Sequence, residues 1–324
     1  MSEKDVRKGA TPIVASQFDY ENSTDAPALS DLSPRDKPWD KHRDNADKVA
    51  NHYRSDEDYR RYADRIDLCS QYLGFKLSPD RDEGLLKLKL SSARFCRVRH
   101  CPVCQWRRSL MWKAKAYRIL PRVVEHYPKH RWLFLTLTVK NCAIYELKKT
   151  LQWMNRSWQR LSQLKKFPAI GFIRSIEVTR GRDGGAHPHF HCLLLVKPGY
   201  FGKNYIKQAE WVEMWRRSLR VDYDPILDVQ AVKKGSQPMQ LIPELLKYCT
   251  KESDLVGDRD WFLELTNQMH RVRATVVGGV FRDYLRLLEE DPDDLIGKGD
   301  EDEVDEGHLY FGWRYQEKKY RKVD

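Results

Sequence analysis

Three histidines, His187, His189 and His191, stand at alternate positions in the stretch HPHFH. The apolar run CLLLV follows directly, so the pattern predicts a β-strand. Successive side chains of a strand point to opposite faces, which places the three imidazoles on one face and Phe190 and Cys192 on the other, in the core. Imidazoles at this spacing can share one metal ion. We therefore interpret the stretch as a metal site on the open face of a sheet, with a surface ladder of histidines as the alternative.

A second group of metal ligands is predicted from the cysteines. Cys96, Cys101 and Cys104 have the spacing C-x4-C-x2-C, and Cys69 lies 27 residues upstream of the first of them. Four thiolates in a tetrahedral array favour zinc and close the site, so the predicted role is structural. His100 is the alternative fourth ligand.

Basic and aromatic residues surround these cysteines. Residues 94 to 122 include nine bases and no acid, with Trp106, Trp112 and Tyr117 between them. Cations contact phosphates and aromatic rings stack on bases, so this composition is typical of a DNA-binding surface. The predicted DNA-binding residues are Arg94, Arg97, Arg99, Arg107, Arg108, Lys113 and Lys115. A purely structural knuckle that supports the sheet is the alternative.

The net charge also indicates a polyanionic partner. The chain of 324 residues carries a formal charge of +11, although residues 289–306 contain eleven acids and one lysine. The remainder has 57 bases against 36 acids and should attract nucleic acid. The acidic segment is interpreted as a solvated linker or as a DNA mimic that restrains the basic surface. No apolar run reaches the length of a membrane span or of a leader peptide, so we expect no membrane association and a cytoplasmic protein.

Alternating and helical patterns predict the elements that position these residues. The predicted strands are 131–139, 171–179, 187–196 and 224–232. Helices are predicted after Asn141, over 204–219, and from Pro243 through Glu252. The order β-α-β-β-α-β-α predicts an α+β fold in which an antiparallel sheet carries helices on one face, in a ferredoxin-like layout.

Composition divides the chain into four predicted parts. Residues 1–55 are a polar arm, expected to be disordered or loosely docked. Residues 56–125 form a zinc-binding, basic DNA-contact module, and residues 126–285 form the domain that contains the sheet. Residues 286–324 hold the acidic segment and an aromatic, basic tail.

Several short motifs follow one another along the chain. They are PWDKH (38–42), FCRVRHCPVCQWRR (95–108), FLTLT (134–138), EVT (177–179), HPHFHCLLL (187–195), ELLKYCTKESD (244–254) and VGG (277–279). Their order and spacing resemble those of the replication initiator proteins of rolling-circle plasmids, in the Gram-positive plasmid branch of the HUH endonuclease superfamily. The resemblance implies that residues 126–285 are a nicking and joining endonuclease domain.

The resemblance implies a metal site at the histidines. His189 and His191 match the family pair of histidines around a bulky apolar residue, and they would bind Mn²⁺ or Mg²⁺. We choose Glu177, on the neighbouring strand, as the third ligand in preference to His187. An ion pair with a neighbouring arginine is the alternative role of Glu177.

The resemblance also implies a tyrosine nucleophile. Tyr248 would attack a DNA phosphodiester and leave a 5′-phosphotyrosine and a free 3′-hydroxyl. Glu244 and Lys251 share the predicted helix with it. Lys251 or Lys247 would favour the phenolate, and Glu244 would activate water as a general base to end replication by hydrolysis.

The predicted function is a plasmid replication initiator that nicks the leading-strand origin and then rejoins the strand or terminates. The implied partners are origin DNA, both duplex and single-stranded, and a host helicase and polymerase, and a homo-oligomer is left open. One alternative is a non-catalytic DNA-binding regulator on the same framework. Another is a relaxase or a single-strand transposase that uses the same chemistry.

Overall fold

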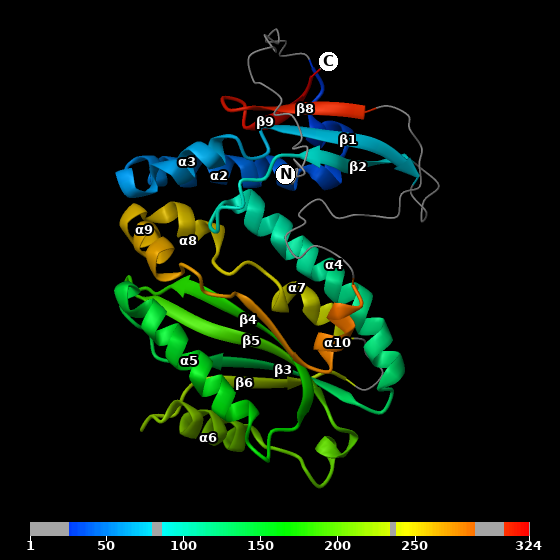
Figure 1. The fold of residues 1–324 in the computed structure, drawn as a ribbon, viewed down its shortest axis with the longest axis vertical. Coiled ribbons are helices and arrows are strands. Elements are labelled where there is room, and N and C mark those ends of the chain that lie inside the picture. Colours follow the sequence, from blue (N-terminus) through cyan, green and yellow to red (C-terminus); the bar gives the residue numbers. More distant parts are fainter. Residues whose placement is uncertain (1–25, 80–85, 234–237, 289–307, 324) are drawn as a thin grey trace, which may run out of the picture.

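The structure is a computed structural model, and it describes residues 26–79, 86–233, 238–288 and 308–323 (Figure 1). The acidic segment 289–306 and the first 25 residues of the predicted arm therefore lie outside the described residues. No described helix combines the length and the apolar character that crossing a membrane would require.

A five-stranded antiparallel sheet forms the lower half of the molecule in Figure 1. Its strands, in the order β6-β3-β5-β4-β7, are β6 (Leu227–Ala231), β3 (Arg131–Thr138), β5 (Ala186–Val196), β4 (Ala169–Arg180) and β7 (Thr275–Gly279). The predicted α+β class with an antiparallel sheet is confirmed. Each of the four predicted strands is present, and β7 adds a fifth at the edge, beside β4.

Helices cover both faces of this sheet. On one face lie α5 (Leu147–Ser162) and α6 (Gln208–Leu219), which bury Phe190 and Cys192 as the alternation predicted. The other face, predicted to be open, packs Leu193 and Leu195 against a second core. The helices that form this second core are α4 (Pro102–His126), α7 (Ile242–Leu245) and α10 (Phe281–Arg286). The run of apolar residues in β5 explains this arrangement, because a strand buried on both faces is apolar at successive positions.

A second, four-stranded sheet joins the two ends of the chain. Its strands, in the order β2-β1-β8-β9, are β2 (Leu86–Ala93), β1 (Tyr72–Pro79), β8 (His308–Arg314) and β9 (Lys319–Val323). The aromatic, basic tail is thus an integral part of the N-terminal module. Tyr320 in β9 is fully buried, and its hydroxyl donates a hydrogen bond of 2.8 Å to the carbonyl oxygen of Ser70.

The prediction that residues 1–55 are a disordered or loosely docked arm is wrong for the described part of that range. This part contains α1 (Leu29–Leu32), a 3-10 turn (Pro34–Asp36) and α2 (Pro38–Arg54). An apolar stripe of α2 is buried at Trp39, Ala46, Val49, Ala50 and Tyr53. Charged residues separate these positions, so the mean polarity hid the helical period. The 3-10 turn Glu57–Tyr59 and α3 (Arg60–Asp67) continue this helical layer.

The predicted helix from Pro243 through Glu252 begins as expected, with Pro243 in the first turn of α7 (Ile242–Leu245), but its continuation beyond Leu245 is wrong. The helix α7 ends at Leu245, and α8 (Glu252–Gly257) and α9 (Arg259–Gln268) begin only after a non-helical segment. The backbone carbonyls that would accept the next hydrogen bonds of the helix accept hydrogen bonds from other segments instead. Leu245 accepts from Ser175, Leu246 accepts from Ser109, and Cys249 accepts from the backbone N–H of Val178. These bonds hold the segment against β4 and α4. The remaining elements are the 3-10 turns Ile144–Glu146, Pro198–Phe201 and Pro238–Leu241.

Candidate active site

Two adjacent strands bring together one carboxylate and two imidazoles. In the β4–β5 ladder Glu177 lies directly opposite His189, and His191 follows on the same face. Oε2 of Glu177 is 2.7 Å from Nε2 of His189 and 2.8 Å from Nε2 of His191. The three ligand atoms lie within 4.8 Å of one another. His187 lies outside this group, with its ring tilted against that of His189 and the two centroids 5.3 Å apart.

The surroundings aim the Nε2 atoms of both histidines at one point. Nδ1 of His189 is 3.3 Å from the carbonyl oxygen of His187, and Nδ1 of His191 is 3.3 Å from Oγ1 of Thr136 on β3. Such contacts fix the orientation of ligating imidazoles. Glu177 is 2% exposed and His191 is 6% exposed. Two nitrogens and one carboxylate oxygen, already converging, suit a divalent ion that keeps positions open for other oxygen ligands.

Lys247 closes the site from the segment after α7. Its ammonium donates to Oε2 of Glu177 at 2.7 Å and to Oε1 of Glu244 at 2.6 Å. Burial alone would raise the pKa of Glu177, but hydrogen bonds from His189, His191 and Lys247 hold that pKa well below its usual range. Glu244 has a half-exposed side chain, and its Oε1 is 3.8 Å from Nε2 of His191. The carboxylate of Glu177 is therefore ionised and surrounded by donors.

Tyr248 directly follows Lys247 and contacts α2. Its hydroxyl is 3.4 Å from Nε2 of His42, and the two ring centroids are 5.9 Å apart. Burial, with a smaller contribution from the charge of Glu252, raises the pKa of Tyr248 to about 12. The predicted shared helix face with Glu244 does not exist, because α7 ends at Leu245, before Tyr248. Lys251 is exposed at the N-terminal cap of α8, and Lys247 makes the carboxylate contacts instead.

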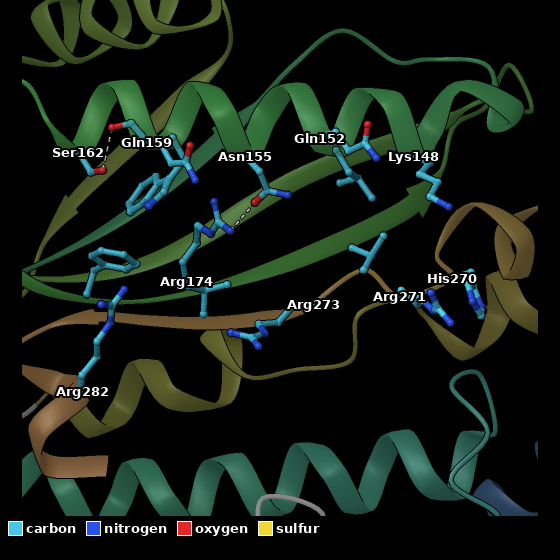
Figure 2. Close-up of a pocket in the computed structure, with 15 residues that line it drawn as sticks. Lys148, Gln152, Asn155, Gln159, Ser162, Arg174, His270, Arg271, Arg273 and Arg282 are labelled. Carbon is cyan, nitrogen blue, oxygen red and sulfur yellow. Dashed lines mark hydrogen bonds between the residues drawn. The ribbon is translucent and has the colours of Figure 1, made fainter. Parts of the chain in front are cut away.

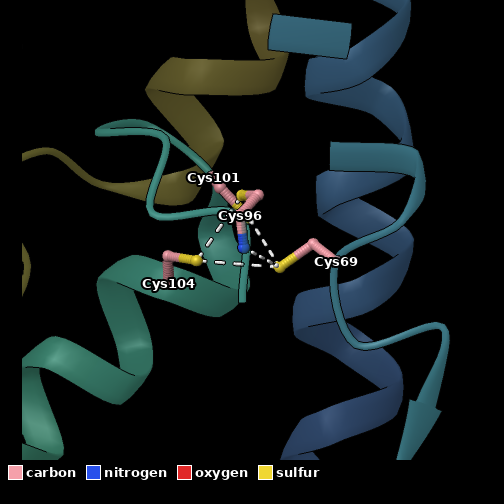
Figure 3. A group of neighbouring side chains, drawn as sticks. All are labelled: Cys69, Cys96, Cys101 and Cys104. Atoms are coloured by element: carbon pink, nitrogen blue, oxygen red, sulfur yellow. Dashed lines mark hydrogen bonds between the residues drawn. The ribbon is translucent and has the colours of Figure 1, made fainter. Parts of the chain in front are cut away.

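Four cysteines from three segments of the N-terminal module converge on one point (Figure 3). Cys69 follows α3, Cys96 and Cys101 flank a tight loop, and Cys104 lies in the first turn of α4. The sulfur atom of Cys69 is 3.6 Å from that of Cys104 and 3.8 Å from that of Cys101. A tetrahedral site with zinc–sulfur bonds of about 2.3 Å requires sulfur separations of about 3.8 Å, so the residues fit zinc.

The alternative ligand His100 lies outside this cluster. It is 1% exposed and packs edge-on against Phe262, with ring centroids 6.1 Å apart. Burial lowers the pKa of His100 to about 3, so its ring is neutral. All seven cysteines are among the described residues, and none forms a disulfide.

Tyr248 lines a basic cavity of about 690 Å³, which we call the tyrosine cavity. Its described lining residues include no carboxylate. The lining cations are Arg97, Arg99, Arg108, Lys247, Arg273, Arg282 and Arg286. Three of the predicted DNA-binding residues, Arg97, Arg99 and Arg108, thus line the same cavity as Tyr248. Lys115 is only 7% exposed, so little of its side chain is accessible to DNA in this structure. Arg94 is exposed, whereas Arg107 and Lys113 are partly buried.

A second basic cavity, the α5 cavity, lies between α5 and the β4–β7 edge of the sheet (Figure 2). It measures about 660 Å³, and amide side chains of Gln152, Asn155 and Gln159 form one wall. Its cations are Lys148, Arg174, Arg271, Arg273 and Arg282. Arg273 and Arg282 also line the tyrosine cavity, so the two cavities meet at β7.

Sequence reasoning missed two residues beside the tyrosine. His42 lies in the motif PWDKH and Glu252 in KESD, both of which were noted only as parts of the resemblance. No local signal marks them, because the direct sequence neighbours of both are polar or charged: Lys41 and Arg43 beside His42, and Lys251 and Ser253 beside Glu252. Their proximity depends on α2 packing against α8, which no local pattern encodes.

Comparison with known proteins identifies relatives over most of the chain. The model of the family Rep_1, replication protein, matches residues 87–321. A "Protein rep" of Bacillus amyloliquefaciens is 32% identical over 320 residues, which cover 88% of this chain and 93% of the relative. A "Protein rep" of Streptococcus pneumoniae serotype 2 is 36% identical and covers 75% of this chain and 78% of the relative. A "Replication protein" of Staphylococcus aureus is 32% identical and covers 64% and 96%. No solved structure matches the chain.

Proposed function

Because this chain belongs to the Rep_1 family of replication proteins, we propose that it initiates plasmid replication by nicking one strand of the origin through attack by Tyr248. The observation that carries this proposal is the convergence of Glu177, His189 and His191 on one point, with Lys247 in contact and Tyr248 next in the chain. A divalent ion would be held by the first three residues. Such an ion supplies Lewis-acid polarisation of the scissile phosphate.

Tyr248 is the proposed nucleophile. Its oxygen forms a bond to phosphorus while the bond between phosphorus and the 3′-oxygen breaks, which leaves a 5′-phosphotyrosine and a free 3′-hydroxyl. The phosphoester link conserves the bond energy for later rejoining. The 3′-hydroxyl serves as the primer for rolling-circle synthesis by host enzymes, for which a helicase and a polymerase are the proposed partners.

Glu244 and Lys247 are the residues proposed to act beside Tyr248 at the scissile phosphate. Lys247 replaces the predicted Lys251 as the cation, because its ammonium lies between Glu177 and Glu244. Glu244 is half-exposed and 3.8 Å from His191, so water can reach it beside the metal ligands. We assign it the general-base role in terminating hydrolysis.

The tyrosine cavity is the proposed entry for single-stranded DNA. Its cations would neutralise phosphates, and Trp112 at its wall offers a ring for stacking. The α5 cavity continues the basic lining beyond β7. The four-cysteine cluster is the proposed zinc site, and it would fix the N-terminal end of α4, whose second turn carries Arg107 and Arg108.

Two other functions remain as alternatives to this proposal. A non-catalytic DNA-binding regulator would bind origin duplex without cutting it. A relaxase or a single-strand transposase would use the same chemistry on a transfer origin or on the end of an element. The buried Glu177 and its convergence with His189 and His191 favour a nuclease over the regulator, because a DNA-binding role alone has no use for a converging ligand set.

A labelled-strand experiment tests the proposal. The protein is incubated with Mn²⁺ and with single strands from its own plasmid's origin that carry the label at either end. We expect the fragment downstream of the nick to become protein-linked through its 5′ end, and the upstream fragment to be released with a free 3′-hydroxyl. Binding of duplex origin DNA without cleavage or linkage of any strand would favour the regulator.

A further inference from the structure

We propose that His42 is the general base for Tyr248 and that Glu252 positions His42 and stabilises its protonated form. This inference rests on the proposed function, since it assigns a proton acceptor to the proposed nucleophile. It adds a catalytic residue from α2, which lies more than two hundred positions before Tyr248 in the chain.

Three residues form a continuous hydrogen-bonded chain. The Tyr248 hydroxyl is 3.4 Å from Nε2 of His42, and Nδ1 of His42 is 2.5 Å from Oε1 of Glu252. Oε2 of Glu252 accepts a bond of 2.6 Å from the side-chain amide of Asn45. Because Nδ1 is the nitrogen that faces the carboxylate, a neutral His42 carries its proton there. Nε2 is then left as a lone-pair acceptor that points at the tyrosine.

The imidazole is held in one orientation from several sides. His42 is 5% exposed, and its ring stacks on Trp106 of α4 with centroids 4.6 Å apart. The carboxylate comes from α8, and Glu252 is 9% exposed. A purely structural tether between α2 and α8 would need only this ion pair. It would not need the second ring nitrogen to meet the hydroxyl of a tyrosine.

The charged group that faces His42 directly is a carboxylate. Glu252 faces it directly from α8, and Lys41, on the same helix as His42, acts on Glu252 from a greater distance. From α4, Trp106 presents a ring to His42, and the guanidinium of Arg107 lies over the same ring. A carboxylate 2.5 Å away stabilises an imidazolium, as in other carboxylate–histidine pairs.

The need for a base follows from the environment of the phenol. Tyr248 is partly buried and close to the negative Glu252, and both effects oppose spontaneous ionisation. The ammonium of Lys247 is bound to two carboxylates, Glu177 and Glu244. A positioned acceptor removes the proton only as the new bond forms, which avoids a free phenolate.

The step balances without a further reactant. The hydroxyl proton of Tyr248 moves to Nε2 of His42, the tyrosine oxygen bonds to phosphorus, and the 3′-oxygen leaves and takes a proton from solvent. His42 is then an imidazolium paired with Glu252. Rejoining runs the same transfers in reverse, with His42 returning its proton to the tyrosine oxygen.

Single-turnover cleavage of a labelled origin strand at saturating Mn²⁺, measured across a range of pH, tests this assignment. We expect His42→Gln to slow formation of the adduct by about 10²-fold or more, and to remove the limb of the pH profile in which the rate rises with imidazole deprotonation. Glu252→Gln should slow it less. Added imidazole should partly restore cleavage by His42→Ala. His52→Gln is the matched control, because His52 also lies on α2 and contacts α8, through the carbonyl of Val256, without touching Tyr248.

The outcomes separate this inference from the proposed function. If Tyr248→Phe abolishes the adduct while His42→Gln keeps the wild-type rate and pH profile, His42 is not the base and the nicking proposal stands. If Tyr248→Phe still forms the adduct, the nucleophile itself is wrongly assigned. If His42→Gln and His52→Gln slow cleavage equally, with the same pH profile as wild type, the pair is only a tether.

Discussion

Lys247 and Glu177 form an ion pair of 2.7 Å at the oxygen that also contacts both histidines. The ammonium therefore occupies space on the same carboxylate oxygen that a divalent ion would use. We expect Lys247→Met to bind Mn²⁺ several-fold more tightly than wild type, because a competing cation is gone. Titration calorimetry checks this. Unchanged or weaker Mn²⁺ binding would show that Lys247 and the ion do not compete.

Removal of a metal ligand should separate cleavage from binding. We expect Glu177→Gln, His189→Ala and His191→Ala each to lower strand cleavage by at least about 10²-fold, because the divalent ion then loses one of its three protein ligands. Affinity for duplex origin DNA should stay within about twofold, since Glu177 and His191 are buried and His189 is only partly exposed. A His187→Ala variant should cleave far better than the other three. Cleavage that persists in the presence of a chelator would contradict the metal role.

The cysteine cluster should contribute stability and not chemistry. We expect Cys101→Ser or Cys104→Ser to lower the zinc content measured by atomic absorption and to lower the melting temperature by several degrees or more. Cys142→Ala, a half-buried cysteine outside the cluster, is the control and should keep the wild-type zinc content. An unchanged melting temperature in a zinc-depleted variant would argue against a structural site.

The pair of His42 and Glu252 predicts a pH dependence of stability. Burial tends to raise the pKa of Glu252, but hydrogen bonds from His42 and Asn45 lower it below its ordinary value of 4.5. A carboxyl whose folded-state pKa is lowered stabilises the fold fully above the unfolded pKa and loses that contribution as the pH falls below it. Urea unfolding at about pH 6 and about pH 4 should show a larger loss in the wild type than in Glu252→Gln. Equal losses would show that this carboxyl has no lowered pKa.

The two cavities predict where single-stranded DNA binds. We expect Arg108→Ala, in the tyrosine cavity, and Arg273→Ala, shared by both cavities, to weaken binding of a single strand and to reduce the slope of log K against log salt by about 0.7 each. Lys165→Ala, an exposed lysine outside both cavities, is the control. If all three variants have the same slope, the strand does not lie in these cavities.

Much of the metal group could be predicted from the sequence because its geometry is local. The spacing of His189 and His191 fixes their common face, and a short hairpin places Glu177 across from them. The continuation of helix beyond Leu245 could not be excluded locally. Its amphipathic pattern is helical, and only the hydrogen bonds from Ser175, Ser109 and Val178 show why the helix does not continue.

Contacts between segments far apart in the sequence could not be predicted either. The helix α2 reaches Tyr248 because it packs against α8, and β8 pairs with β1 across most of the chain length. The apolar period of α2 marks a buried face, but nothing in either segment identifies the partner that covers it. Polar composition therefore suggested an arm and a tail where the structure has one module.

Identification of the DNA-linked peptide tests the central claim most directly. After reaction with an origin single strand and Mn²⁺, trypsin cleaves behind Lys247 and Lys251 and releases the tetrapeptide YCTK, in which Tyr248 is the sole tyrosine. We predict that mass spectrometry after nuclease trimming finds the nucleotide on this peptide, joined through a 5′-phosphate. A nucleotide on a different tyrosine, or cleavage with no linked peptide, would contradict the assignment of Tyr248 as the nucleophile.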